Sequence, residues 1–185
     1  MSDPESILEA AEKVCGILER HRVGAVVIGA VALAAYNYVR NTEDLDFGVN
    51  AELEELRCLA HSLVEEGFSV ELHEPDAQDP LGGVLDVGGP FGLLQIVSFA
   101  GRFTAVIEDA LQSSNLLVRE GSPLKLVPIA HLIALKLYAG GHKSQADIVE
   151  LLRRNPDLDL ESVRELCRRY RLRGLEDLIE EAHSL

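Results

Sequence analysis

Two aspartates separated by one residue, Asp44 and Asp46, are the residues of this sequence best suited to chemistry. They stand at the start of a short apolar run, and in a β-strand residues two apart point to the same face of the sheet. Their carboxylates would then lie side by side and repel each other unless a cation lay between them. Mg²⁺ prefers oxygen ligands and usually keeps water and substrate phosphates in its shell. The pair therefore predicts a catalytic magnesium site for phosphoryl-type transfer, with both aspartates as metal ligands.

A glycine turn precedes this pair. Val23 to Ile28 is an apolar run of strand length, Gly29 follows it, and Ala30 to Val39 has the composition of a helix. Glycine lets the backbone approach a phosphate closely, and the free N–H groups at the start of a helix favour an anion. The backbone of Gly29 and Ala30 is therefore a candidate phosphate-binding turn.

The spacing of these two features resembles the signature of the DNA polymerase β-like nucleotidyltransferase superfamily. In that superfamily a Gly-Ser or Gly-Gly turn and a helix precede Arg-x-Thr-x-Asp-x-Asp, and here the match is Arg40-Asn41-Thr42-Glu43-Asp44-Leu45-Asp46. The resemblance implies a Mg²⁺-dependent transfer of a nucleoside monophosphate from a nucleoside triphosphate to a hydroxyl group. It assigns Arg40 and Thr42, with the Gly29 turn, to positioning the triphosphate.

A second stretch supports a narrower resemblance. Residues 132–139 and 143–152 look like the downstream helices of the AbiEii-type group, which includes nucleotidyltransferase toxins of toxin–antitoxin systems. The resemblance implies that Lys136 approaches the nucleotide phosphates, and it raises the possibility of an antitoxin partner. The alternative for Lys136 is a residue whose aliphatic part covers apolar surface while its ammonium group reaches water. Ser144 replaces an aspartate of the group, and Asp147 could either orient Lys136 or cap the next helix.

The sequence departs from the superfamily pattern at two further positions. Ala30 lacks the hydroxyl that the Gly-Ser turn offers, although its backbone donor remains. Catalytic members usually carry a third carboxylate on a later strand, and the strand that aligns best here places Gln95 at that position. A glutamine amide cannot take a proton at neutral pH. Asp86 on the preceding candidate strand, or Glu71, could substitute for it.

Two interpretations of function follow. The first is a nucleotidyltransferase whose acceptor is a tRNA end, a protein hydroxyl or a small molecule such as an aminoglycoside. The second is a non-catalytic relative that retains the fold and binds a nucleotide or a partner protein, which the glutamine at position 95 favours.

The charge balance bears on the acceptor. The chain has a formal net charge of −14, which argues against general binding to DNA or RNA backbones. One region differs, because seven of the 17 basic residues lie within a short stretch: Arg153, Arg154, Arg164, Arg168, Arg169, Arg171 and Arg173. This Arg-rich stretch is either a solvated helix face or a surface for RNA or an acidic partner. An acidic surface would suit a small cationic acceptor.

The elements that must position these residues follow from periodicity. Helical spacing occurs at 4–21, 52–66 and 103–111, short strands at 68–73, 84–87 and 93–99, strand edges at 116–119 and 124–127, and helices from Pro128 onward. This pattern predicts an α/β (α+β) fold with a mixed sheet flanked by helices, divided into a core at 1–127 and a C-terminal helical region at 128–185. The first helix contains several glutamates, so it is neither a secretory signal nor a membrane span, and a cytoplasmic protein with no membrane partner is expected.

Overall fold

The computed structural model describes residues 4–40, 44–75 and 82–184, and its centre is a five-stranded sheet. The strand order is β1-β2-β5-β4-β3, where β2 and β5 run parallel and all other neighbours are antiparallel. The strands are β1 (Ala25–Ile28), β2 (Asp44–Val49), β3 (Ser69–His73), β4 (Gly83–Gly89) and β5 (Gly92–Ser98). The predicted mixed sheet flanked by helices is confirmed.

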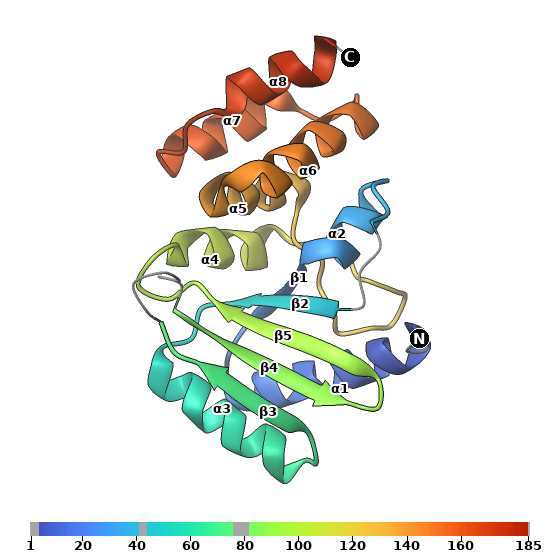
Figure 1. The fold of residues 1–185 in the computed structure, drawn as a ribbon, viewed down its shortest axis with the longest axis vertical. Coiled ribbons are helices and arrows are strands. Elements are labelled where there is room, and N and C mark those ends of the chain that lie inside the picture. The colour runs from blue at the N-terminus through green and yellow to red at the C-terminus, as the bar shows by residue number, and fades with distance from the viewer. Residues whose placement is uncertain (1–3, 41–43, 76–81, 185) are drawn as a thin grey trace.

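One face of this sheet is buried. Alternate residues of the central strands, such as Phe47, Leu85 and Ile96, are almost fully buried on it. Two amphipathic helices, α1 (Pro4–Arg20) and α3 (Leu53–Glu65), cover this face and lie behind the sheet in Figure 1. They are joined at the surface by Arg20, whose guanidinium donates to Glu66 at 2.8 Å. This side of the sheet is the apolar core.

The opposite face is covered over only part of its width. Helices α2 (Gly29–Ala35) and α4 (Thr104–Ser113) pack over β1 and β2 there. Gly48 shows how close α4 lies, because a Cβ at this position would be 2.9 Å from Cδ1 of Ile107. No helix of the described chain lies in front of β5, β4 and β3 in Figure 1. We call this uncovered part the open face; its polar side chains include Gln95, Asp86, Glu71 and His73.

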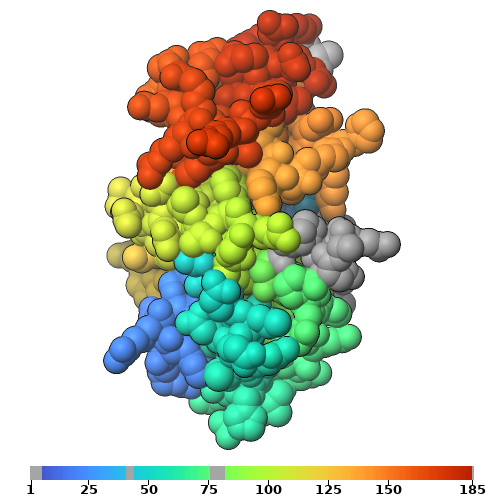
Figure 2. All heavy atoms as spheres, turned by 90° about the vertical axis from the view of Figure 1, so that its left-hand side faces the viewer, coloured from blue at the N-terminus to red at the C-terminus, as the bar shows by residue number. Residues whose placement is uncertain are grey.

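The C-terminal helices form one end of an elongated molecule, opposite α3 (Figure 2). They are α5 (Ile129–Ala139), α6 (Gly141–Arg154), α7 (Leu160–Arg169) and α8 (Leu175–Ser184). Helix α5 packs against both α6 and α7, and α6 packs against α8. The predicted boundary between residues 127 and 128 coincides with the start of α5. One continuous apolar cluster includes residues of these helices and of the sheet, so the division into two domains stays a prediction.

Two sequence-based expectations about elements were wrong in detail. The helix expected over 30–39 ends at Ala35, because Asn37 adopts a left-handed conformation with φ of 64° and the hydroxyl of Tyr36 donates to the carbonyl of Val127 at 2.8 Å. The segments 116–119 and 124–127 form only isolated bridges, Leu117 with Lys125 and Val27 with Leu126. The early end of α2 involves a contact between segments far apart in the sequence, since Tyr36 and Val127 are 91 positions apart.

None of the helices in the described ranges combines the length and apolar character needed to cross a membrane.

Candidate active site

The two aspartates lie on the same face of β2, as their spacing predicts. Asp44 begins the strand, and Asp46 pairs in register with Ile28 at the end of β1. Gly29 therefore comes directly beside Asp46. A Cβ at Gly29 would lie 1.8 Å from Oδ2 of Asp46, and the glycine also has a φ of +65°. The contact with Asp46 excludes a side chain at position 29, and the positive φ disfavours one, so the turn and the carboxylate form one unit.

The environment of Asp46 disfavours its charge. Burial raises the pKa of this carboxyl above its usual range, and the neighbouring charge of Asp44 raises that pKa further. Three cations act in the opposite direction: Lys136, Arg40 and Lys143. A cation bound to this partly buried pair would reduce the repulsion between the two carboxylates and stabilise their ionised forms.

The donor set fits Mg²⁺ better than a transition metal. The described residues contain no group of three or more His, Cys, Asp or Glu side chains placed to hold a metal ion. Asp44 and Asp46 offer carboxylate oxygens alone, so water and substrate phosphates would have to supply the remaining ligands. Mg²⁺ is usually bound in this way, through one or two carboxylates, whereas zinc sites rely on nitrogen and sulfur ligands.

Next to the aspartates lies a group that we call the cation cluster: Arg40, Lys136 and Lys143, with Asp147 between the first two. Nζ of Lys136 donates to Oδ2 of Asp147 at 2.6 Å, and Nη1 of Arg40 donates to both carboxylate oxygens at 3.0 and 3.1 Å. The side chain of Asp147 is 3% exposed and that of Lys136 is 13% exposed. Because two cations share one carboxylate, the cluster retains net positive charge beside Asp46.

This geometry decides between the two alternatives left open for Asp147. It lies inside α6 rather than at its start, and it orients Lys136. Its second partner, Arg40, was not foreseen, since the two residues are 107 positions apart in the sequence. The sequence did contain one indication of such a partner. Asp147 stands among the apolar residues Ala146, Ile148 and Val149, and an acid buried in such a run needs a cationic partner.

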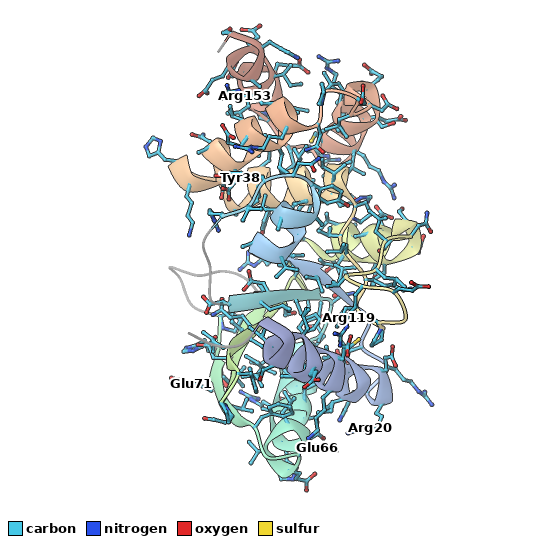
Figure 3. The ribbon with its side chains drawn as sticks, turned by 90° about the vertical axis from the view of Figure 1, so that its right-hand side faces the viewer. Arg20, Tyr38, Glu66, Glu71, Arg119 and Arg153 are labelled. Atoms are coloured by element: carbon cyan, nitrogen blue, oxygen red, sulfur yellow. The ribbon has the colours of Figure 1, made fainter. Side chains whose placement is uncertain are left out.

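The segment that carries Arg40 is anchored to α6. The side-chain amide of Asn155 donates to the carbonyl of Tyr36 at 2.9 Å, and the guanidinium of Arg154 lies 5.3 Å from the centre of the Tyr38 ring. Figure 3 shows Tyr38 close to the C-terminal helices, with Arg153 beyond it. These contacts bring the chain after α2 to the cation cluster.

A row of polar residues crosses the open face. Asp46 on β2 is in register with Gln95 on β5, Gln95 with Asp86 on β4, and Asp86 with Glu71 on β3. Nε2 of Gln95 donates to Oδ1 of Asp86 at 2.7 Å, and Nε2 of His73 lies 3.0 Å from Oδ2 of Asp86. Gln95 thus occupies the position beside Asp46, and Asp86 stands one strand farther away. His73 is a neighbour that the sequence did not reveal.

The structure brings together most of the predicted site residues. Gly29, Ala30, Asp44 and Asp46 meet where β1 and β2 lie side by side. Arg40 and Lys136 share Asp147, and the charges of both cations act on Asp46. Thr42 lies outside the described residues.

The Arg-rich stretch is distributed over surface ion pairs. Five of its arginines contact carboxylates: Arg153 and Arg154 pair with Glu150, Arg164 with Glu176, Arg168 with Glu161, and Arg169 with Asp109. Their positive charge is largely balanced, which favours a solvated helix face over a surface for RNA.

No protein-family model and no curated protein matches the sequence. Solved structures do. The antibiotic-resistance factor ANT(2″)-Ia in solution is 18% identical with a TM-score of 0.56, and the match covers 98% of this chain and 99% of that one. A crystal structure of ANT(2″)-Ia in complex with adenylyl-2″-tobramycin is 18% identical with a TM-score of 0.53 over 90% of this chain and 97% of that one.

A third match is an antigenic nucleotidyltransferase-like protein from Paracoccidioides brasiliensis, 16% identical with a TM-score of 0.49 over 84% of this chain and 78% of that one. At the identity of the ANT(2″)-Ia structures, the similarity concerns the fold. Together with the element order described above, it shows that this chain has a nucleotidyltransferase fold.

Proposed function

We propose that this protein is a Mg²⁺-dependent nucleotidyltransferase that transfers a nucleoside monophosphate from a nucleoside triphosphate to a hydroxyl acceptor. One observation carries the proposal: a carboxylate pair suited to a cation lies beside the net positive cation cluster. A triphosphate bound to Mg²⁺ is complementary to both features, because its phosphates bind to cations and its Mg²⁺ binds to carboxylates.

The residues would divide the work as follows. Asp44 and Asp46 would hold Mg²⁺, which when bound neutralises phosphate charge. Lys136, Arg40 and the backbone N–H groups of Gly29 and Ala30 would orient the triphosphate, with Thr42 as a further contact. Fixing the reacting groups and balancing their charge supplies most of the rate enhancement in phosphoryl-type transfer.

The reaction itself is a displacement at the α-phosphorus. The acceptor oxygen forms a bond to this phosphorus while the bond to the oxygen bridging towards the β-phosphorus breaks, and pyrophosphate leaves. The proton of the hydroxyl group must go to a base. Gln95, the residue in register beside Asp46, cannot accept it.

Among the possible acceptors, charge favours a small cationic molecule with hydroxyl groups over RNA. The open face carries Asp86 near the aspartate pair, and the Arg-rich stretch is balanced by carboxylates. ANT(2″)-Ia, whose fold this chain shares, was crystallised with adenylyl-2″-tobramycin, which makes an amino sugar a reasonable first acceptor to test. A protein hydroxyl, and an antitoxin partner as in the AbiEii-type group, rest on the resemblance of residues 132–152 alone.

A second candidate is a nucleotide-binding protein without transfer activity. The amide of Gln95 beside Asp46 is the observation that favours it, because that position offers neither a base nor a metal ligand with negative charge.

The test combines binding with transfer. We would titrate ATP, CTP, GTP and UTP with Mg²⁺ into the protein by calorimetry, alongside the Asp44→Asn/Asp46→Asn variant, and follow label from α-³²P-labelled nucleotides onto tobramycin and onto tRNA. We expect saturable, Mg²⁺-dependent binding that the variant loses while it remains folded by circular dichroism, and transfer to tobramycin. Binding without transfer to tobramycin or tRNA would count against both of these acceptors and favour the second candidate. No binding of any nucleotide would refute both.

A further inference from the structure

One edge of the sheet lies beyond β1, where the chain between α4 and α5 folds back on itself. Val27 of β1 pairs in parallel with Leu126, and the adjacent Lys125 pairs in antiparallel orientation with Leu117. In the described chain, residues 116–118 are therefore the outermost extended segment on this side of the sheet. We propose that this edge pairs with the same edge of a second copy of the protein. The inference is independent of the proposed nucleotidyl transfer.

The backbone of Leu117 supplies the groups for such pairing. On its inner side, the N–H of Val118 donates to the carbonyl of Leu124, and the N–H of Leu126 donates to the carbonyl of Leu116, both at 2.9 Å. In an antiparallel pair, a residue between two such bonds directs its own N–H and C=O to the opposite side. Neither of these two groups of Leu117 has a hydrogen-bond partner in the described chain. A further extended strand can satisfy both of them.

The side chains along this edge are apolar and exposed. Leu116 is 52% exposed and Leu117 is 44% exposed, and the two are adjacent in the chain. The other large hydrophobic residues with exposed side chains in the described ranges, Val39, Val64 and Tyr138, are separate from one another in the sequence. Single apolar residues are ordinary on a protein surface, whereas adjacent ones beside unsatisfied backbone groups indicate a contact surface.

The charge of the chain favours a second copy at this edge over any other part of its surface. The formal net charge is −14, so two copies repel each other over most of their surface. The residues from Ala110 to Val118 include no charged side chain. Arg119, which follows them and is labelled in Figure 3, is paired with Glu12 on α1 at 2.7 Å. Two copies can therefore meet here without bringing unpaired carboxylates together.

A twofold axis beside Leu117 completes the hydrogen bonds. When two copies pair in antiparallel orientation with Leu117 opposite Leu117 of the second copy, each N–H donates to the carbonyl of the other residue. Opposite residues of this kind have Cα atoms about 5.5 Å apart, so the two leucine side chains also contact each other. One segment thus supplies both halves of the contact, as an interface with twofold symmetry requires.

Sedimentation equilibrium of the full chain, without nucleotide, tests the association. We expect the average mass to rise from that of the 20.2 kDa monomer towards twice that value between about 1 and about 500 µM, because a short edge gives a weak interface. Hydrogen exchange followed by NMR should slow at the amide of Leu117 as the concentration rises. The amide of Val118 is already bonded to Leu124 in each copy, so its exchange should change less.

Two glutamate substitutions separate this edge from a general effect of charge. In Leu117→Glu the new carboxylate faces Lys125 across the bridge, so a single copy should remain folded, but two copies would bring like charges together. We expect the dissociation constant of the dimer to rise at least about tenfold. Val64→Glu is the matched control, because Val64 is 54% exposed on α3 and the change of charge is the same. Its dissociation constant should stay within about threefold.

Mixing two charged variants tests the register. Leu117→Lys alone should associate as poorly as Leu117→Glu alone, because each places like charges opposite one another. An equimolar mixture of the two should associate, because residue 117 faces its counterpart in the proposed pair. Circular dichroism of each variant checks that it is folded.

Three results would overturn the proposal. A monomer over the whole concentration range would exclude the second copy. Equal association of Leu117→Glu and Val64→Glu would assign any dimer to another surface. Failure of the mixed variants to associate would refute the pairing of Leu117 with itself. None of these results bears on nucleotidyl transfer, because no nucleotide is present.

Discussion

Two regions of this molecule are rich in cationic side chains, and they differ in how far neighbouring carboxylates balance the positive charge. In the cation cluster, Arg40 and Lys136 share the single buried carboxylate of Asp147, and Lys143 adds a third positive charge near Asp46. In the Arg-rich stretch, five arginines meet four carboxylates at the surface. The Arg-rich stretch contains more arginines than the cation cluster, but it is therefore the less suitable site for an anionic ligand.

The contrast is sharpest between two acids of α6. Asp147 and Glu150 lie three residues apart, and each binds two cations. The side chain of Asp147 is 3% exposed, whereas that of Glu150 is 26% exposed and its arginines extend into water. Surface ion pairs contribute little to stability, but removal of one partner from a buried pair leaves an uncompensated charge.

The largest expected effect is the loss of Asp147. Asp147→Asn should lower the free energy of unfolding by about 3–5 kcal/mol, because Lys136 and Arg40 lose their shared counter-charge in a buried setting. Glu150→Gln is the control on the same helix and should cost at most about 1 kcal/mol. Urea denaturation followed by circular dichroism measures both. Equal losses of unfolding free energy in the two variants would mean that burial does not explain the difference between the two regions.

A second pair of variants probes the glycine turn beside the cluster. Gly29 and Gly101 have nearly the same φ, +65° and +70°, but only Gly29 has a neighbour in the space of a Cβ, Oδ2 of Asp46 at 1.8 Å. Gly101→Ala should therefore cost only the backbone strain, about 1–2 kcal/mol. Gly29→Ala should cost more and should also abolish Mg²⁺-dependent nucleotide binding, as calorimetry would detect. Retained binding in Gly29→Ala would show that Asp46 is not needed in its present position.

A third comparison removes one cation from each region. Lys136→Gln should weaken ATP binding about tenfold or more, because a charged hydrogen bond to phosphate contributes about 1.5–3 kcal/mol. Arg168→Gln should leave ATP binding unchanged, since Arg168 is 68% exposed and pairs with Glu161 on α7. Calorimetry at two salt concentrations would check both. A similar loss of ATP affinity in the two variants would indicate that general electrostatic attraction, and not a specific contact at Lys136, holds the nucleotide.

The smallest effect concerns pH. His131 on α5 is buried, and neither ring nitrogen has a hydrogen-bond partner in the described structure. Burial lowers its pKa below the usual 6.5, with Arg169 acting in the same direction and Asp109 opposing it. The unfolded chain then binds more protons than the folded one as pH falls below 6.5, so stability decreases over that interval, by at most about 1.4 kcal/mol per pH unit.

Thermal denaturation between pH 7.5 and 5 checks this expectation. The Tm of His131→Leu should depend less on pH than that of the unmodified protein, because the variant lacks the titrating group. An unchanged slope in that variant would assign the acid sensitivity to other groups.

Local features of the site were predictable, and long-range ones were not. Asp44, Asp46 and Gly29 could be recognised because strand alternation and a glycine before a helix act over a few residues. The shared bond of Arg40 and Lys136 to Asp147, and the contact of His73 with Asp86, depend on how distant segments meet. The early end of α2 has the same origin, since Tyr36 is bonded to Val127.

Strand β3 has one further consequence, for the solubility of the molecule. It is the last strand of the sheet, and in the described chain no other strand pairs with its outer side. An unpaired strand edge is a template for pairing with a second molecule, and charged side chains on such a strand oppose that pairing. Glu71 is exposed on β3, so its negative charge opposes this pairing, and we expect a Glu71→Gln variant to associate more readily in light-scattering measurements.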